Sequence, residues 1–323
     1  MKKRYLPWAM ATSLAATAWA GFQANPIAGP MDGRGATFAV QGALGLLNGE
    51  AKEHVYDYET LGGSRRQLSR LDWDLKNVVM GGANGSVRLL GQLTLNGGLW
   101  LALTEGSGEM DDYDWLDPRT TDWTHYSLSE VDVTAGYILD LNAAWDLVAD
   151  WHGLTAGVLA GYKQDGWTWE DRGVYLLYPE YGYVPQDLYG ENMINYEQEF
   201  RMPYLGASAD WTWNNFTLAG RLTYSPYMWA TDWDDHVQRD MHYQEDFAGG
   251  DMLGLGFEAR YDFAQGALKG VFLAAALDYQ KIDLIVGDME YYNGATGERG
   301  GDQDVAGIEN DYLILSFGGG IRF

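Results

Sequence analysis

The segment TDWDDHV, residues 231–237, places three aspartates and one histidine within five residues. Asp232, Asp234 and His236 occupy every second position, so on a β-strand their side chains point to the same side. Carboxylates held this close repel one another unless a cation approaches them. The segment therefore fits a solvated loop, a metal site or a catalytic group beside a binding pocket.

A catalytic reading uses two pairs of residues. His236 can act as a general base, with Asp234 orienting the ring and stabilising its protonated form. A second acidic segment, MDDYDWLD, places Asp112 and Asp114 on one strand face at the same spacing. These two carboxyls can position a water molecule and share a proton. If the fold brings the pairs together, a water molecule is held between them.

Each residue also has an ordinary structural interpretation. Aspartate pairs near loops are usually solvated turns, and a single histidine such as His236 usually lies on the surface. Aspartate and histidine can also bind metal ions, but no paired-histidine or loop-cage spacing occurs, and we predict no metal. We expect four scattered histidines to be structural or exposed: His54, His125, His152 and His242.

The start of the chain predicts an export signal. A basic KKR at positions 2–4 precedes an apolar stretch that is too short for a membrane-spanning helix. The small residues of AWA at 18–20 fit a cleavage site before Gly21. We therefore expect a signal peptide over residues 1–20 and a single mature domain over residues 21–323.

Composition narrows the function. The chain has no cysteine, which excludes disulfides, thiol catalysis and thiolate metal sites. A formal net charge of −25 argues against nucleic-acid binding. The same charge favours cationic partners if it is concentrated in one cleft, and otherwise serves solubility.

Alternating residues predict a membrane β-barrel. In residues 253–263, apolar side chains at odd positions alternate with glycine and charged side chains at even positions. A soluble β-sandwich also alternates, but its core could not bury unpaired charges such as Glu258, Arg260 and Asp262. Abundant glycine and aromatic residues, and a last strand that ends on Phe323, also fit an outer-membrane barrel. We predict an all-β, ten-stranded antiparallel transmembrane β-barrel.

The predicted strands and connections define where the acidic segments lie. We expect strands near residues 35–58, 65–79, 86–105, 125–140, 152–170, 196–213, 215–234, 251–263, 268–286 and 308–323. Long loops are expected at 105–124, 171–195, 235–250 and 287–307, alternating with short turns. Long extracellular strand extensions and loops would then carry both acidic segments to one mouth of the barrel.

Strict alternation creates a conflict in the seventh predicted strand. Phe216, Leu218 and Tyr224 would face lipid at even positions, and the same parity would turn His236 outward. We therefore predict a β-bulge between Ser225 and Ala230, helped by Pro226, which cannot donate to the strand ladder. The bulge would switch the parity and direct the cluster into the mouth.

Seven segments together resemble the omptin family of bacterial outer-membrane proteases. They are KEHVY (52–56), RQLSRLDW (66–73), EMDDYDWLD (109–117), AGYKQDGWTW (160–169), EFRMPYLG (199–206), TDWDDH (231–236) and AGIEND (306–311). The resemblance covers nearly all of the mature chain and implies a ten-stranded barrel with peptidase activity.

The resemblance also implies residue roles. Asp112 and Asp114 would form an aspartate couple, Asp234 and His236 a dyad, and together they would activate water against a peptide carbonyl. Glu53 and Asp232, with Met110 beside them, would form an acidic pocket for arginine or lysine on the amino side of the cut. Ser127 is the nearest candidate for the serine nucleophile once proposed for this family, and we do not favour it.

Two departures from the family pattern concern binding beyond the cut site. Omptins bind lipopolysaccharide through basic residues of the outer wall, whereas Gly166 and Glu199 stand at the corresponding positions here. Lipopolysaccharide as an activating lipid would then depend on other residues such as Arg172 or Arg201. His125 replaces an acidic side chain, so a preference for a second basic residue is not expected.

The resulting prediction is an outer-membrane endopeptidase whose active site faces the cell exterior. It would cleave peptides or proteins after arginine or lysine without a cofactor, and any activation by lipopolysaccharide would depend on the other basic residues named above. The alternative is a catalytically silent barrel that serves as an adhesin or a narrow channel. Inward charges such as Arg260 and Glu258 predict an interior plugged by ion pairs, which argues against a wide pore.

Overall fold

The computed structural model describes residues 37–58, 65–89, 91–177, 186–187 and 190–323. The predicted signal peptide, residues 1–20, lies outside these ranges. Among the described residues, none of the helical segments is long and apolar enough to cross a membrane.

Strands form most of the described chain. Their bounds are β1 (Thr37–Asp57), β2 (Arg66–Leu89), β3 (Leu93–Ala102), β4 (Gly106–Asp114), β5 (His125–Trp151), β6 (Leu154–Leu177), β7 (Gln186–Asp187), β8 (Ile194–Trp213), β9 (Phe216–Ser225), β10 (Met228–His236), β11 (Met241–Gly249), β12 (Met252–Asp262), β13 (Val271–Asn293) and β14 (Arg299–Arg322). Two short 3-10 turns, η2 (Val237–Arg239) and η3 (Gly266–Leu268), lie in connections.

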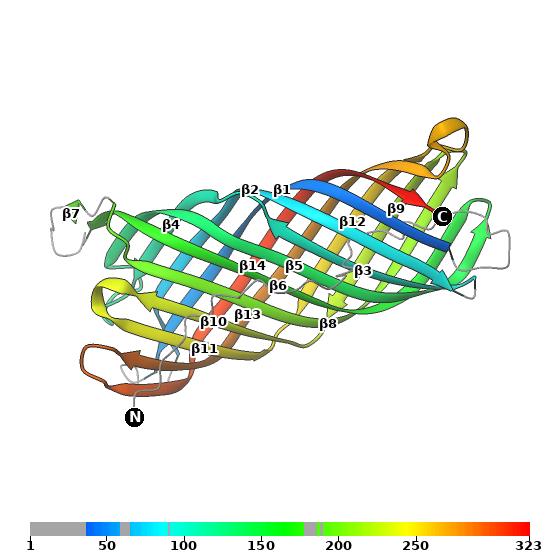
Figure 1. Ribbon diagram of the computed structural model, residues 1–323. Coiled ribbons are helices and arrows are strands. Elements are labelled where there is room, and N and C mark those ends of the chain that lie inside the picture. The colour runs from blue at the N-terminus through cyan, green and yellow to red at the C-terminus, as the bar shows by residue number, and fades with distance from the viewer. Residues whose placement is uncertain (1–36, 59–64, 90, 178–185, 188–189) are drawn as a thin grey trace, which may run out of the picture.

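The strands close into an antiparallel barrel (Figure 1). The last strand, β14, pairs with β1, which completes the ring. Three barrel strands are each built from two consecutive segments, namely β3 with β4, β9 with β10, and β11 with β12. The two-residue β7 pairs with β6. Counted this way, the described chain forms the ten-stranded barrel that the sequence predicts.

Several predicted loops are strands instead. β4, β11 and the ends of β13 and β14 occupy much of the expected loops 105–124, 235–250 and 287–307. The expected turn after residue 79 is also wrong, because β2 continues to Leu89. Gly82 lies against the Trp100 ring, and an added Cβ would come within 2.5 Å of it. Gly82 therefore makes room for a packed aromatic ring.

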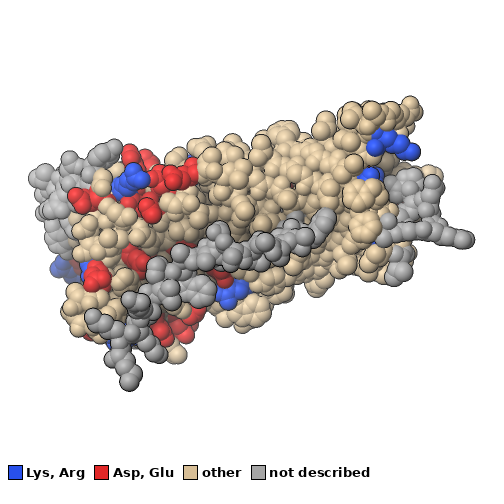
Figure 2. All heavy atoms as spheres, viewed as in Figure 1, with Lys and Arg blue, Asp and Glu red and all other residues tan. Residues whose placement is uncertain are grey.

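An apolar band surrounds one part of the barrel. Its outward side chains include Leu44, Leu95, Leu101, Leu141, Leu205, Leu218, Phe257, Leu273, Leu315 and Phe317. Exposed aromatic residues flank the turns at its edge, among them Trp151, Trp213 and Phe216. Figure 2 shows carboxylates gathered near one end of the visible face, beyond a wide area without acidic side chains. We refer to that part of the molecule as the acidic end.

Inside the apolar band, ion pairs fill the barrel. Arg260 is buried, with its Nε atom 3.1 Å from Asp262 and its Nη1 atom 3.7 Å from Glu258. A second pair joins Arg221 to Asp140 at 3.3 Å. These contacts give the buried charges partners, as their cost of desolvation requires. The predicted plugging by Arg260, Glu258 and Asp262 is confirmed.

The predicted bulge is present between β9 and β10. Leu205 of β8 pairs with Tyr224, whereas Arg201, four residues earlier, pairs with Trp229, five residues later. One extra residue has therefore entered the β9–β10 side of the ladder. Tyr224 and Trp229 both point outward, while Asp232 and Asp234 are buried. The parity switch turns the acidic cluster into the barrel.

Candidate active site

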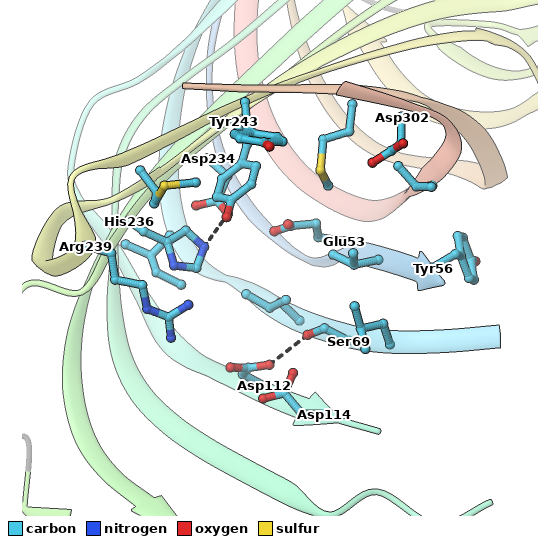
Figure 3. A pocket seen from close by; sticks show the side chains of 18 of the residues that line it. Glu53, Tyr56, Ser69, Asp112, Asp114, Asp234, His236, Arg239, Tyr243 and Asp302 are labelled. Carbon is cyan, nitrogen blue, oxygen red and sulfur yellow. Dashed lines mark hydrogen bonds and ion pairs between the residues drawn. The ribbon is translucent and has the colours of Figure 1, made fainter. Parts of the chain in front are cut away.

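A cavity of about 550 Å³ opens at the acidic end, beyond the apolar band. Figure 3 shows side chains that line it. It is lined by residues of β1, β2, β4, β8, β10, β11, β13 and β14 and of the turn η2. All four residues predicted to be catalytic line it: Asp112, Asp114, Asp234 and His236. The structure therefore brings together side chains from two segments that are more than a hundred residues apart in the sequence.

One side of the cavity carries a histidine–carboxylate pair. The Nε2 atom of His236 lies 2.8 Å from Oδ2 of Asp234, its neighbour on the inner face of β10. Burial by itself would lower the pKa of His236, but the charge and hydrogen bond of Asp234 raise it above its ordinary value. The other ring nitrogen has no hydrogen-bond partner among the described residues.

The facing side carries the two aspartates of β4 (Figure 3). Ser69 donates a hydrogen bond to Oδ1 of Asp112 at 3.1 Å, and Ser127 donates one to Oδ2 at 3.2 Å. Burial, followed by the charge of Asp114, raises the pKa of Asp112 to about 7. Burial also raises the pKa of Asp114. The two carboxyls can therefore hold one shared proton near neutral pH.

The two pairs influence each other across the cavity. The charge of His236 lowers the pKa values of Asp112 and Asp114, although burial outweighs it. In return, the charge of Asp112 helps to raise the pKa of His236. Ser127 is not among the lining residues, and its hydroxyl is directed to Asp112. Ser127 thus orients a carboxyl and is not presented to the cavity.

The predicted acidic pocket lies beside the histidine pair. Glu53, on the inner face of β1, lines the cavity, whereas Asp232 is completely buried behind it. Tyr196 of β8 donates a 2.8 Å hydrogen bond to Oδ2 of Asp232. Met110 does not line the cavity and packs in a buried cluster that includes Trp73.

The acidic pocket contains unbalanced negative charge. Oε2 of Glu53 and Oδ1 of Asp232 are buried without a hydrogen-bond partner. Burial, followed by the charges of neighbouring carboxylates, raises the pKa of Glu53 well above its ordinary value. Burial also raises the pKa of Asp232 well above its ordinary value. Buried acceptors without donors are costly, so this arrangement suits a cationic guest.

One further buried carboxylate, Glu245, lies behind the cavity wall and was not predicted from the sequence. It lies on β11 directly opposite Asp232 and is buried. The sequence predicts a loop over residues 235–250, whereas most of this range is the strand β11. Glu245 and Phe247 are two residues apart and both point inward, and this spacing is the sequence signal that could have identified the strand.

The remaining histidines lie outside the cavity. His54 contacts Glu309 at 2.9 Å, and the exposed His242 contacts Asp235 at 2.6 Å. Thr124 and His125 are joined by a 2.8 Å hydrogen bond. None of the four histidines predicted to be structural or exposed lines the cavity. Among the described residues, no group of three or more histidine or carboxylate side chains could hold a metal ion.

The outer wall at the predicted lipid-binding positions carries a paired arginine. Arg201 lies 2.7 Å from Glu199, and Glu199 also accepts a 2.9 Å hydrogen bond from Tyr137. The other basic candidate, Arg172, pairs with Asp132 at 2.8 Å. Both cations are therefore balanced by carboxylates of the barrel wall.

Comparison with known proteins assigns the family. The sequence pattern of the Omptin family matches residues 35–323. The chain is 33% identical to the plasminogen activator of Yersinia pestis over 89% of this chain and 90% of that protein. It is 28% identical to protease 7 of Escherichia coli strain K12, over 85% of this chain and 87% of that protein.

A solved structure agrees with the fold. The outer membrane protease OmpT of Escherichia coli matches with a TM-score of 0.82 at 24% identity, over 89% of this chain and 97% of that chain. At this identity the likeness concerns the barrel alone, and the sequence match carries the family assignment. The chain belongs to the omptin family of outer-membrane proteins.

Proposed function

We propose that this protein is an endopeptidase that cleaves after arginine or lysine by activating a water molecule. The observation that supports it most is the placement of the Asp234–His236 pair opposite Asp112 and Asp114 in one cavity, beside a buried acidic pocket. The proteases among its relatives support the same reaction class.

The proposed reaction uses the free nitrogen of His236 as the general base. A water molecule between the two pairs gives a proton to His236 while its oxygen forms a bond to the peptide carbonyl carbon. Asp234 stabilises the imidazolium that results. The aspartate couple, with one shared proton, keeps an oxygen that accepts a hydrogen bond from the water. His236 then returns a proton to the leaving amine as the carbon–nitrogen bond breaks.

Glu53 and Asp232 supply the proposed specificity. Their unpartnered oxygens lie in a buried, negatively charged pocket next to the reacting pair. A guanidinium or ammonium group would bring both charge and hydrogen-bond donors to them. The carboxylates at the acidic end would also attract cationic chains from solution.

The proposed orientation places the acidic end outside the cell, so that peptides reach the cavity from the exterior. Lipopolysaccharide is proposed as an activating lipid. Its phosphates would have to compete with Glu199 for the side chain of Arg201. A passive channel is disfavoured because ion pairs fill the barrel within the apolar band.

The test is cleavage of a fluorogenic peptide with a single arginine, measured with and without lipopolysaccharide. Wild-type protein should cleave it, and His236→Ala should reduce the rate by about 10²–10⁴-fold. His242→Ala is the matched control, because His242 lies outside the cavity. All variants should keep the heat-dependent gel mobility of a folded barrel. Equal inactivity of wild type and His236→Ala in both conditions would refute the proposal.

A further inference from the structure

Glu245 is a buried carboxylate for which the mechanism above gives no role. It points inward from β11 and, like Asp232, lies buried behind the residues that line the cavity. Neither of its oxygens has a hydrogen-bond donor within the described residues. Leaving a carboxylate in this state is costly. A residue whose burial opposes folding in the empty protein suggests a partner that arrives with the substrate.

The surroundings of Glu245 are acidic on the side that faces the barrel interior. Asp232 and Asp234 face it from β10, and Glu53 faces it from β1. Tyr196 of β8 also lies within electrostatic range of it. On its other flank, the residue paired with it on β13 is the uncharged Met289. No lysine or arginine therefore contributes to the principal electrostatic environment of Glu245.

Counting acceptors favours one kind of guest. When all three are ionised, Glu53, Asp232 and Glu245 together present four buried oxygens without donors, two of which belong to Glu245. A guanidinium has five N–H donors in a planar fork, whereas an ammonium has three donors at a single point. An arginine side chain can therefore serve carboxylates on several sides of the pocket, and a lysine side chain leaves some of them unsatisfied.

We propose that Glu245 forms a third acidic side of the specificity pocket, where it selects arginine over lysine and couples guest binding to proton release. This inference rests on the proposed function and adds a specificity residue to it. Three carboxylates around one monovalent cation retain excess negative charge, so the empty pocket favours protonation of some of them. A guest cation favours the ionised forms and expels those protons.

The electrostatics of the pair Asp232–Glu245 agree with this coupling. Burial, followed by the charges of Asp232 and Glu53, raises the pKa of Glu245 well above its ordinary value. One proton shared between Glu245 and Asp232 would join the two carboxyls in the empty protein. Binding of arginine should therefore strengthen as the pH rises, until the empty pocket has lost its protons by itself.

The test compares Glu245→Gln with Asp246→Asn. Both variants remove one negative charge from β11, but Asp246 points outward and is exposed. The values of kcat/KM are measured for two peptides that differ only by arginine or lysine before the cut, from about pH 5 to about pH 9. Glu245→Gln should lower the arginine value about 10- to 100-fold, which is the worth of a charge-assisted hydrogen bond, and the lysine value less. Asp246→Asn should keep the wild-type ratio.

A measurement of peptide binding tests the specificity pocket without peptide hydrolysis. In a His236→Ala background, the peptide stays intact, and calorimetry in buffers of different ionisation enthalpy gives the protons released on binding. Release should fall when Glu245→Gln is added and should persist with Asp246→Asn. Glu245→Asp, which keeps the charge with shorter reach, provides a second variant if Glu245→Gln does not fold, and it should lose part of the arginine preference.

The outcomes are distinct. If wild type cleaves the arginine peptide but Glu245→Gln and Glu245→Asp both keep its arginine-to-lysine ratio and its proton release, the role of Glu245 is wrong and the proposed peptidase remains. If wild type neither cleaves nor binds either peptide, the proposed function fails and this inference fails with it.

Discussion

The Oδ2 atom of Asp234 lies 2.8 Å from Nε2 of His236, two residues further along the same strand. Both side chains point inward because the bulge between β9 and β10 has already switched the parity. We expect Asp234→Asn to lower kcat about 10²–10⁴-fold, since the amide cannot stabilise the imidazolium. Asp235→Asn is the matched control on the outer face, and equal losses in the two variants would contradict the assignment.

The titration of His236 should depend on the same contact. Its pKa should lie above the ordinary value of about 6.5 in the wild type. In Asp234→Asn, burial would be opposed only by the weaker charge of Asp112, so the pKa of His236 should fall below that value. Nuclear magnetic resonance of labelled histidine in detergent micelles measures both values. An unchanged or higher pKa in the variant would show that Asp234 is not the dominant partner.

The bulge offers a test of geometry without any change of charge. Deletion of Tyr227 removes the extra residue, so strict alternation would turn Asp232 and Asp234 to the outer face. We expect no measurable peptide cleavage from this variant, even in the fraction that shows the gel mobility of a folded barrel. Pro226→Ala keeps the residue count and should retain cleavage. Full activity after the deletion would mean that the bulge does not position the site.

The acidic pocket should make stability depend on pH. The pKa values of Glu53, Asp232 and Glu245 are raised on folding. The folded protein therefore binds more protons than the unfolded chain above the ordinary values of about 4. The stability of the empty protein should fall as the pH rises from there through the raised values.

Glu245→Gln should reduce this loss of stability. The variant removes one buried carboxylate, so its apparent melting temperature at neutral pH should exceed that of wild type by a few degrees. Thermal unfolding in detergent, followed by circular dichroism at one scan rate, measures the difference. Asp246→Asn should show a smaller effect, and a lower melting temperature for Glu245→Gln at every pH would contradict the argument.

The sequence pattern predicted the strands in the part of the barrel where the outer face meets lipid and the inner face makes polar contacts. Along β12, lipid outside and polar contacts inside give a clear alternation between Leu253 or Phe257 and Glu258 or Arg260. The bulge was predictable for the same reason, because Tyr224 and His236 could not both obey one parity. The two acidic pairs followed from their spacing and from the barrel that gathers strand ends at one mouth.

Beyond the apolar band, the outer and inner faces of a strand no longer differ in polarity. The prediction of strands failed there. Both faces of β11 carry polar residues, with Gln244 and Asp246 outside and Glu245 inside, so no period of two distinguishes it from a loop. Glu245 was missed as a result. The prediction failed at residues 81–85 for a different reason, since Gly81, packed against Leu103, and Gly82, packed against the Trp100 ring, look like turn residues in the sequence.

The ion-paired interior limits the routes by which a peptide could enter and leave the cavity. Arg260 and Arg221, held by Glu258, Asp262 and Asp140, occupy the barrel beneath the cavity. Under the proposed function, a peptide in the cavity would meet this ion-paired interior, and both halves of a cut chain would leave through the opening by which the chain arrived. Under the proposed function, the protein would modify molecules on one side of the membrane without passing any fragment to the other.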